Sequence, residues 1–443
     1  MNKTVDIYGA GLAGAEAAWQ VANRGIKVRL FEMKPKKRTP AHTYGGFAEL
    51  CCSNSLRSDA VFNAVGLLKE EMRRLGSLVL EAADATRVPA GSALAVDRFG
   101  FSDYITEKLK NHPNIEIIGE EMTTGESENP LIIATGPLTS EPLAEWIKNS
   151  FGAKTLNFFD AAAPIVDFSS INMEKAFFAS RYGKGDADYI NCPMEKDEYL
   201  AFLDALIHAR TAELHDFDRE AQKDLTVFEG CMPVEVMAAR GEDTLRYGPL
   251  KPVGLPDPKT GKEYYAVVQL RQDDKNGNMY NMVGFQTHLA IPEQKRVFSM
   301  IPGLENAEFF RFGVMHRNTY LNSPEILDCR YKVKDGRALW FAGQMTGVEG
   351  YVESAASGFV AGVDAALSVL GEAPVEFSEK TALGALGHYV STGLNGRFDP
   401  MNVNFGIIAP LESRVKGGKR AKNDALSARA LEITDELAKQ LLK

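Results

Sequence analysis

The stretch Val5–Gly14 carries three glycines spaced G-x-G-x-x-G, between a short apolar run and the helix-forming segment Ala15–Ala22. This spacing is typical of a strand that turns directly into a helix around a bound nucleotide. Gly9 permits the tight turn, Gly11 lets the backbone approach a pyrophosphate, and Gly14 lets the helix pack close to the strand. The phosphates then lie at the helix N-terminus, where free N–H groups and the helix dipole favour anions.

A second strand and an acidic residue follow in the order that a dinucleotide-binding unit requires. Gly25 ends the predicted helix, Lys27–Phe31 is the predicted strand, and Glu32 follows it directly. An acid at this point can accept hydrogen bonds from a ribose hydroxyl. The cofactor-contacting residues predicted from this unit are Gly9, Ala10, Gly11, Leu12, Ala13, Gly14 and Glu32. A dinucleotide and S-adenosylmethionine both stay open here, because enzymes of either kind place a glycine loop and an acid in this way.

The composition is that of an ordinary globular protein. The chain has 443 residues, of which 45% are hydrophobic and 25% charged, so two or three domains are expected. The N-terminus leads directly into a strand and no apolar run approaches the ~20 residues of a membrane span, so we expect neither a signal peptide nor a membrane partner. The net charge of −9 argues against nucleic acid as a partner unless basic residues are concentrated locally.

The cysteines indicate a reducing compartment. The chain has five, none of them in a C-x-x-C pair, which argues against a disulfide framework and a structural zinc site. We therefore expect a cytoplasmic protein without a metal centre.

Further helices and strands are predicted between the second strand and a second nucleotide signature. Ala64–Ala83 has the pattern of an amphipathic helix, and Phe101–Leu109 is a second helix. Short strands are expected at Ala93–Arg98, Ile115–Ile118 and Leu131–Ile133. The last of these runs into Ala-Thr-Gly, a combination found where flavin and nicotinamide enzymes turn the backbone over a nucleotide. Thr135 and Gly136 are therefore predicted to contact the cofactor.

A third segment late in the chain returns to the same cofactor. Ala338–Gln344 is a predicted strand, and a glycine-rich loop leads into a helix of small residues that ends near Leu370. Flavoproteins aim such a helix at the isoalloxazine, whose reduced form carries negative charge. The predicted contacts are Gly343, Gln344, Gly347, Gly350 and Tyr351. Gln344 departs from the aspartate that many flavoproteins carry there. Since S-adenosylmethionine has no use for this segment, FAD is favoured.

The middle of the chain changes character. Strands at Ala266–Arg271 and Met279–Phe285, a hairpin turn at Pro256–Lys262 and scattered helices predict an inserted α+β domain. The predicted fold class is therefore α/β, with a Rossmann-like, glutathione-reductase-like FAD-binding domain formed by residues 1–160 and 331–443 with C-terminal helices. Residues 161–330 form the inserted domain, which covers the flavin and contributes to substrate binding.

Two cysteine contexts are candidates for chemistry. Cys51 and Cys52 lie in the polar segment Phe47–Ser58, after the second strand, where loops reach the ligand. Adjacent residues in an extended segment point in opposite directions, so at most one thiol is expected to face a ligand. Cys231 lies between Gly230 and Pro233 before a short helical run, a context that can lower a thiol pKa. A buried structural thiol is the alternative for each.

The remaining cysteines and two histidines are assigned to the structure. Cys192 and Cys329 are expected in the core, and His288 and His316 are expected to be structural.

Two basic stretches have a solvated loop as the first interpretation and a phosphate contact as the second. They are Lys34–Arg38 and Arg414–Lys422, the latter interpreted as a linker.

Taken together, these motifs resemble the bacterial folate- and FAD-dependent tRNA (uracil-5-)-methyltransferases over nearly the whole chain. The matching segments are Gly9–Gly14, Cys52–Ser58, Phe228–Pro233 and Gly343–Tyr351. The cysteine motifs separate this family from the related, longer flavin subunit of the tRNA carboxymethylaminomethyl-uridine enzyme. Cys51 is additional to the family pattern, so position 52 is the matching one.

The resemblance implies methylation of the T-loop uridine 54 of tRNA. A thiolate adds to uracil C6, C5 takes a methylene unit from 5,10-methylenetetrahydrofolate, and reduced FAD supplies the hydride. NADPH or NADH re-reduces the flavin. By family match Cys231 is the attacking thiolate and Cys52 the second catalytic thiol, although the two roles could be exchanged.

The resemblance also implies RNA contacts and leaves alternatives. The target base must leave its stack, which requires a pocket surrounded by basic residues. The candidates are Arg57, Arg98, Lys36, Arg38, Lys419 and Arg420. We expect a monomer or weak homodimer that binds tRNA and tetrahydrofolate. The same chemistry on a 23S rRNA uridine and a non-methylating RNA-binding flavoprotein stay open.

Overall fold

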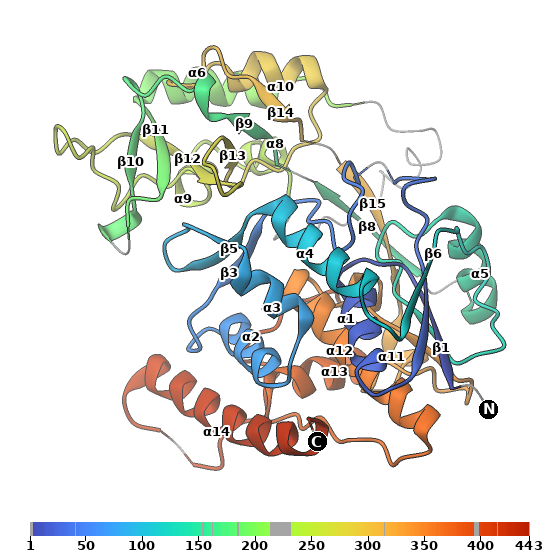
Figure 1. Ribbon diagram of the computed structural model, residues 1–443. Coiled ribbons are helices and arrows are strands. Elements are labelled where there is room, and N and C mark those ends of the chain that lie inside the picture. Colours follow the sequence, from blue (N-terminus) through green and yellow to red (C-terminus); the bar gives the residue numbers. More distant parts are fainter. Residues whose placement is uncertain are drawn as a thin grey trace.

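The computed structural model describes residues 3–39, 41–152, 155–161, 163–183, 186–212, 232–313, 315–393, 398–413 and 415–442. The described part has two bodies of secondary structure, one with a parallel sheet and one with an antiparallel sheet (Figure 1).

A parallel sheet organises the first body. Its described strands have the order β16 (Leu339–Phe341), β7 (Leu131–Ile133), β1 (Thr4–Tyr8), β2 (Lys27–Phe31) and β6 (Ile115–Ile118). All neighbours in this sheet are parallel. The chain proceeds to one side of β1 through β2 and β6 and then to the other side through β7 and β16. A ligand-binding crevice is expected where the order reverses, at the carboxyl ends of β1 and β7.

Two helices with small residues at their contact cover this sheet (Figure 1). α1 (Leu12–Ala22) follows β1, and α12 (Tyr351–Leu370) follows β16. A Cβ added at Gly358 of α12 would collide with the backbone of Ala13 in α1. The two helices can therefore lie this close only because glycine occupies the contact. α12 is long and apolar enough to cross a membrane, but 83% of its apolar window is buried, as in a core helix.

Other helices complete the first hydrophobic core. They are α4 (Arg98–Lys110), α5 (Glu141–Phe151), α11 (Ser323–Ile326), α13 (Ala382–Thr392) and α14 (Gly418–Leu441). The predicted single helix over Ala64–Ala83 is wrong: α2 (Ala64–Arg74) and α3 (Leu78–Ala85) are separate. The chain breaks at Gly76, with a φ of 79°, and the Ser77 hydroxyl caps α3 by accepting from the Leu80 N–H. Apolar periodicity continues across this break, so periodicity alone did not reveal it.

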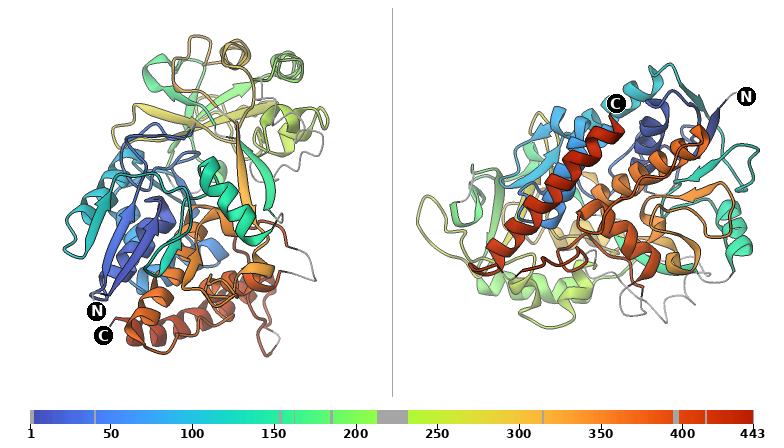
Figure 2. Two further views of the ribbon diagram at one scale, coloured as in Figure 1. Left: turned by 90° about the vertical axis from the view of Figure 1, so that its right-hand side faces the viewer. Right: turned by 90° about the horizontal axis from the view of Figure 1, so that it is seen from below.

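The C-terminal region also differs from the prediction. Lys419, Arg420 and Lys422 belong to the first turns of α14 and not to a linker. α14 lies beside α2 on the underside of the molecule (Figure 2), where Arg74 forms an ion pair with Asp435 at 2.9 Å.

A small antiparallel sheet follows the Cys51–Cys52 segment. It consists of β3 (Ser55–Ser58), β5 (Ala93–Val96) and β4 (Arg87–Val88). Asp97 ends β5 and caps α4, since its carboxylate accepts from the Gly100 N–H at 2.6 Å. The predicted strand over Ala93–Arg98 therefore ends early, and Arg98 is the first residue of a helix.

The second body contains an antiparallel sheet and its own hydrophobic core. The strand order is β10 (Phe177–Ala179), β11 (Tyr189–Met194), β12 (Ala266–Gln272), β13 (Met279–Met282), β9 (Ile165–Asp167) and β14 (Phe309–Arg311). The helices are α6 (Lys196–Ile207), α8 (Val234–Ala238), α9 (Thr244–Tyr247) and α10 (Ile291–Phe298). The turn at Pro256–Lys262 forms, with the Gly261 N–H donating to the Asp257 carbonyl at 2.7 Å, but neither described flank is a strand, so the hairpin prediction is wrong.

An antiparallel ribbon connects the two bodies. β8 (Thr155–Ala161) leads out of the first and β15 (Met315–Leu321) returns to it. Leu321, Ile326 and Leu327 already belong to the first hydrophobic core. The domain boundaries at 160/161 and 330/331 stay a prediction.

Candidate active site

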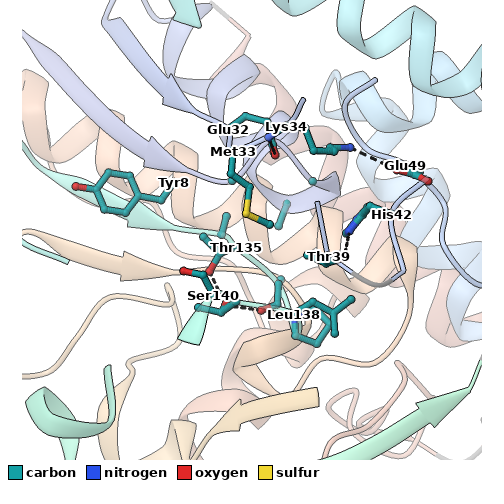
Figure 3. A pocket seen from close by; sticks show the side chains of 18 of the residues that line it. Tyr8, Glu32, Met33, Lys34, Thr39, His42, Glu49, Thr135, Leu138 and Ser140 are labelled. Atoms are coloured by element: carbon teal, nitrogen blue, oxygen red, sulfur yellow. Dashed lines mark hydrogen bonds and ion pairs between the residues drawn. The ribbon is translucent and has the colours of Figure 1, made fainter. Parts of the chain in front are cut away.

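A large cleft opens at the carboxyl ends of the parallel strands (Figure 3). It runs from the β1–α1 turn to the start of α12. The predicted cofactor residues that line it are Gly9, Gly11, Leu12, Ala13, Glu32, Thr135, Gly136, Gly343, Gln344 and Tyr351. Cys51 and Cys52 line it as well. That at most one of the two thiols faces a ligand stays a prediction. The structure thus brings segments from distant parts of the sequence to one surface.

The β1–α1 turn has the form of a phosphate cradle. Gly9 has a φ of 91°, and a Cβ added at Gly14 would collide with the Gly9 carbonyl. A Cβ at Gly11 would meet no described atom within 4 Å, so this glycine leaves open space on the cleft side. Within the described chain no side chain caps the N-terminus of α1. Its free N–H groups are thus available to an anion, as a bound pyrophosphate requires.

Glu32 joins the end of β2 to this turn. Its two carboxylate oxygens accept from the backbone N–H groups of Ala10 and Lys34, each at 2.9 Å. The side chain is buried and lines the cleft. A carboxylate has about four lone-pair sites, so Glu32 retains acceptors for ribose hydroxyls. The predicted residue Ala10 itself does not line the cleft and contributes through this hydrogen bond.

One wall of the cleft is formed by polar side chains whose contacts the sequence did not predict. Lys34 is buried, donates to the Gly46 carbonyl at 2.6 Å and lies 3.5 Å from the Glu49 carboxylate (Figure 3). Beside them His42 and Thr39 share a hydrogen bond of 2.6 Å. Burial, with the charge of Lys34 adding to it, lowers the pKa of His42. A neutral imidazole can offer a donor or an acceptor to a polar ligand.

The ends of β7 and β16 close the other side. The Thr135 hydroxyl lies 2.6 Å from the Thr139 hydroxyl, and Gly136 has a φ of 72°. At Gly343 the backbone N–H donates to the Ser357 hydroxyl at 2.7 Å. These contacts hold two strand ends against the cleft.

The Gln344 amide is oriented by a buried pair. Its nitrogen donates to the Tyr320 hydroxyl at 3.0 Å and to the Glu349 carboxylate at 3.2 Å. The Tyr320 hydroxyl in turn donates to Glu349. Because the nitrogen is held by this pair, the amide oxygen is the atom left to accept from a ligand hydroxyl. Gln344, which stands where many flavoproteins carry an aspartate, thus still supplies a hydrogen-bond acceptor.

Gly347 and Gly350, two further predicted contacts, do not line the cleft. A Cβ at Gly347 would collide with the Phe398 ring, and one at Gly350 would collide with the Glu353 carboxylate. Both glycines allow close packing of the loop that leads into α12. The N-terminus of α12, like that of α1, has no side-chain cap among the described residues.

Tyr351 connects α12 to the Cys52 segment. Its hydroxyl accepts from the backbone N–H groups of Cys52 at 2.7 Å and Ser53 at 3.2 Å. Burial raises the pKa of Tyr351 and raises the pKa of the Cys51 thiol to about 12, so Cys51 is a neutral thiol at physiological pH. Cys231 lies outside the described residues.

Residues of the second body hold the same segment, and sequence reasoning missed them. Arg271 of β12 donates to the Ser53 hydroxyl at 2.6 Å and to the Asn54 amide oxygen at 3.1 Å. The Asn54 amide nitrogen donates to the Gln272 carbonyl at 2.9 Å. These partners are 217 and 218 residues apart in sequence, so no local pattern links them.

The predicted RNA contacts divide into buried and exposed residues. Arg98 is a correction: it is 5% exposed and forms a bidentate ion pair with Asp273, at 2.7 and 2.9 Å. A phosphate cannot displace this buried carboxylate without leaving it unpaired. Arg57 is partly exposed and pairs with Glu353. Lys36, Arg38, Lys419 and Arg420 are exposed. Arg420 stacks on the Phe62 ring, 3.6 Å from its centroid.

The residues assigned to the structure mostly follow expectation. Cys192 is fully buried in the second core, whereas Cys329 is only partly buried, so its assignment to the core is corrected. His288 is buried, and its backbone N–H donates to Glu235 at 2.7 Å. Across the described residues no group of three or more His, Cys, Asp or Glu side chains is arranged to hold a metal ion.

Comparison with known proteins defines the family. The family model for glucose inhibited division protein A, GIDA, matches residues 4–373. The methylenetetrahydrofolate--tRNA-(uracil-5-)-methyltransferase TrmFO of Acetivibrio thermocellus is 61% identical over 432 residues, which cover 98% of each chain. The protein of that name from Listeria monocytogenes is 57% identical over 441 residues, 100% of both chains. The chain belongs to the TrmFO family.

Membership of the TrmFO family confirms the resemblance predicted from the glycine and cysteine motifs. The fold is confirmed as well: a crystal structure of GidA from Aquifex aeolicus has a TM-score of 0.71 at 18% identity, covering 100% of this chain and 74% of that one. The α/β class with a Rossmann-like first body is thus shared with the GidA fold.

Proposed function

We propose that the protein methylates C5 of the T-loop uridine 54 of tRNA, with 5,10-methylenetetrahydrofolate as one-carbon donor and reduced FAD as hydride source. The observation that carries this proposal is the position of Cys52. It lies at one end of a dinucleotide cleft, held by Tyr351 at the N-terminus of α12. The full-length TrmFO relatives are named for methylenetetrahydrofolate as donor and for C5 of a tRNA uracil, and the choice of uridine 54 is our proposal.

The cleft residues fit FAD. The uncapped N-terminus of α1 and Gly11 would hold the pyrophosphate, and Glu32 would hold a ribose. Gln344 would accept from the ribityl chain and the N-terminus of α12 would face the ring. When bound and reduced, FAD supplies the hydride that completes the methyl group.

The protein's own groups prepare the uracil. Because C5 of uracil is a weak nucleophile, a thiolate adds to C6 and turns C5 into an enolate-like carbon. We assign this attack to Cys231 and the role of second thiol to Cys52, as the family match implies. The Tyr351 hydroxyl accepts from the peptide N–H groups on both sides of Cys52, which keeps Cys52 at the cleft.

The other participants belong to the same proposal. NADPH or NADH reduces the flavin, and the reaction takes place in the cytoplasm, where tRNA and folates are found. The exposed basic residues Lys36, Arg38 and Lys419, with partly exposed Arg57, are the RNA contacts that we would test first. Because the total charge is −9, we expect RNA to bind through a local basic patch. The affinity of this binding should depend strongly on salt concentration. A monomer or weak homodimer stays our prediction.

The test supplies purified protein with unmodified tRNA, methylenetetrahydrofolate and NADPH, and maps the uridine that gains a methyl group. Cys231→Ala and Cys52→Ala should abolish methylation and keep the flavin absorption spectrum, whereas the matched control Cys329→Ala should stay active. S-adenosylmethionine in place of the folate should give no product. Methylation of a 23S rRNA fragment but not tRNA would overturn the substrate, and methylation by both cysteine variants would overturn the thiolate mechanism.

A further inference from the structure

Three arginines surround the Cys52 segment, and their charges are not balanced. Arg98 and Arg271 are buried, and Arg311 is partly buried on β14. Arg98 takes the buried carboxylate of Asp273 in a bidentate pair. Arg271 is engaged by Ser53 and Asn54. Among the described residues, Asp273 is thus the carboxylate shared by a cluster of three cations.

Arg311 is the member with donors to spare. A guanidinium has five N–H donors, and within the described part of the chain Arg311 makes one long hydrogen bond, from Nη2 to the Cys52 carbonyl at 3.4 Å. Its Nε is buried and has no hydrogen-bond partner among the described residues. No carboxylate of the described chain lies within ion-pair distance of it. Burial lowers the pKa of Arg311, and the charge of Arg98 lowers it further, whereas the more distant carboxylate of Asp273 opposes the shift.

The backbone directs Arg311 to this place through an irregularity. Phe309 pairs with Val166 on β9, and Arg311 pairs with the adjacent residue Ile165. One residue of β14 therefore has no partner on β9, which is a β-bulge. The extra residue, Phe310, is 56% exposed. Such bulges are frequent beside active sites, where they redirect a side chain. Here the bulge lies on the edge strand β14, and the guanidinium that follows it donates to the Cys52 carbonyl and interacts electrostatically with Cys52 and Tyr351.

We propose that Arg311 is a catalytic residue that donates its free N–H groups to O4 of the target uracil. This inference rests on the proposed function. When the thiolate sulfur forms its bond to C6, the C5=C6 electron pair moves onto C5 and, through the carbonyl, onto O4. The negative charge that develops on O4 would then face Arg311, which has no carboxylate within ion-pair distance among the described residues. No proton moves to or from Arg311, which stabilises the charge where it develops.

The test measures covalent capture of RNA that carries 5-fluorouridine at the target position. After C5 has accepted the one-carbon unit, fluorine cannot leave as a cation, so the thiolate is not expelled and the protein–RNA adduct survives denaturing electrophoresis. We expect Arg311→Gln to slow adduct formation at saturating RNA about 100-fold, the effect of losing one oxyanion donor. Arg311→Lys should restore part of the rate. Arg296→Gln, an exposed ion-paired arginine on α10, is the matched control and should leave the rate unchanged.

Binding and cofactor content distinguish this role from others. The RNA dissociation constant and the flavin absorption spectrum of Arg311→Gln should equal those of the unchanged protein. Weaker RNA binding with a salt slope reduced by about 1 would identify a phosphate contact and overturn the proposal. An unchanged adduct rate would overturn it as well. If the unchanged protein forms no adduct, the proposed function itself fails, a result that differs from failure at Arg311 alone.

Discussion

At the scale of single residues, Glu32 shows how one carboxylate builds a binding surface. It accepts from the backbone of the glycine turn and from the residue that follows β2, so it fixes two loops of the cleft at once. Because the group is buried, both hydrogen bonds act in a low-dielectric surrounding. The acid that the sequence places after a second strand is therefore both a ligand contact and a structural connector.

We predict that Glu32→Ala weakens FAD binding by about 10- to 100-fold, the effect of losing hydrogen bonds to a charged group. The loss combines a missing ribose contact with a glycine turn that is no longer held at Ala10. Flavin fluorescence during titration of the apoprotein measures it. Glu116→Ala, an exposed acid on the neighbouring strand β6, serves as control and should bind FAD normally. Equal affinity of the two variants would contradict the role of Glu32.

At the scale of elements, the packing of α1 on α12 connects both ends of the cleft. α1 presents its N-terminus to the pyrophosphate position, and α12 presents its own to the Cys52 end. Gly358 and Gly362 allow the two helices to approach, since a Cβ at either would press on the backbone of α1.

Gly358→Ala should therefore destabilise the protein by about 1–3 kcal/mol, the usual cost of overpacking. It should also weaken FAD binding, because the two helix N-termini move apart. Urea unfolding and flavin titration measure the two effects. Gly119→Ala adds the same methyl group where the structure describes no atom within 4 Å, and it should change neither quantity.

A second element contact gives stability a pH dependence. The buried Glu71 of α2 accepts from the first N–H groups of α13, Ala382 and Leu383, each at 2.8 Å. Burial raises the pKa of Glu71 from 4.5 to about 7, although the two N–H groups oppose the shift. The folded protein therefore binds more protons than the unfolded chain between these values. The stability from this group is complete below pH ~4.5 and decreases as the pH rises to ~7.

Glu71→Gln keeps an acceptor for α13 and cannot ionise. We therefore expect it to remove the decrease in the free energy of unfolding, on the order of 3 kcal/mol, that accompanies the rise in pH from ~4.5 to ~7. The measurement is the free energy of unfolding of both proteins at intervals from pH 4.5 to 8. Parallel curves for the two proteins would show that Glu71 does not titrate in this range.

At the scale of the whole molecule, a buried ion pair joins the two bodies. Arg98 begins α4 in the first, and Asp273 follows β12 in the second, 175 residues away. Beside this pair the Asp97 carboxylate accepts from the Lys275 N–H at 2.7 Å. The Cys52 segment lies at this junction, so the alignment of the bodies and the position of the thiol depend on the same contacts.

Asp273→Asn should cost about 3–5 kcal/mol of stability, because it leaves the charge of Arg98 buried without a counterion. Arg98→Met in combination with Asp273→Asn should recover part of the loss, since the buried charge is then gone. Asp335→Asn, which breaks an exposed pair with Arg337, should cost at most about 1 kcal/mol. A loss at Asp273 no greater than at Asp335 would show that this junction adds little stability.

Local pattern was sufficient for part of this protein. The strand–glycine–helix unit, Glu32, the Ala-Thr-Gly turn and the return to α12 could be predicted, because each depends on residues that are neighbours in sequence. The same local view was wrong at Arg98. Its neighbour Asp97 caps a helix, which turns the arginine inward to Asp273, and this partner cannot be inferred from the sequence around position 98.

The sequence by itself thus determined the nucleotide-binding unit, the family and the candidate thiols, since glycine spacing, apolar periodicity and short motifs are properties of adjacent residues. The tertiary structure decided which distant groups meet at Cys52. Tyr351, Arg271 and Arg311 reach that segment from a helix and two strands that follow it by hundreds of residues. The physical reason is that burial and long-range charge contacts arise only when the two hydrophobic cores form and bring these groups into one low-dielectric site.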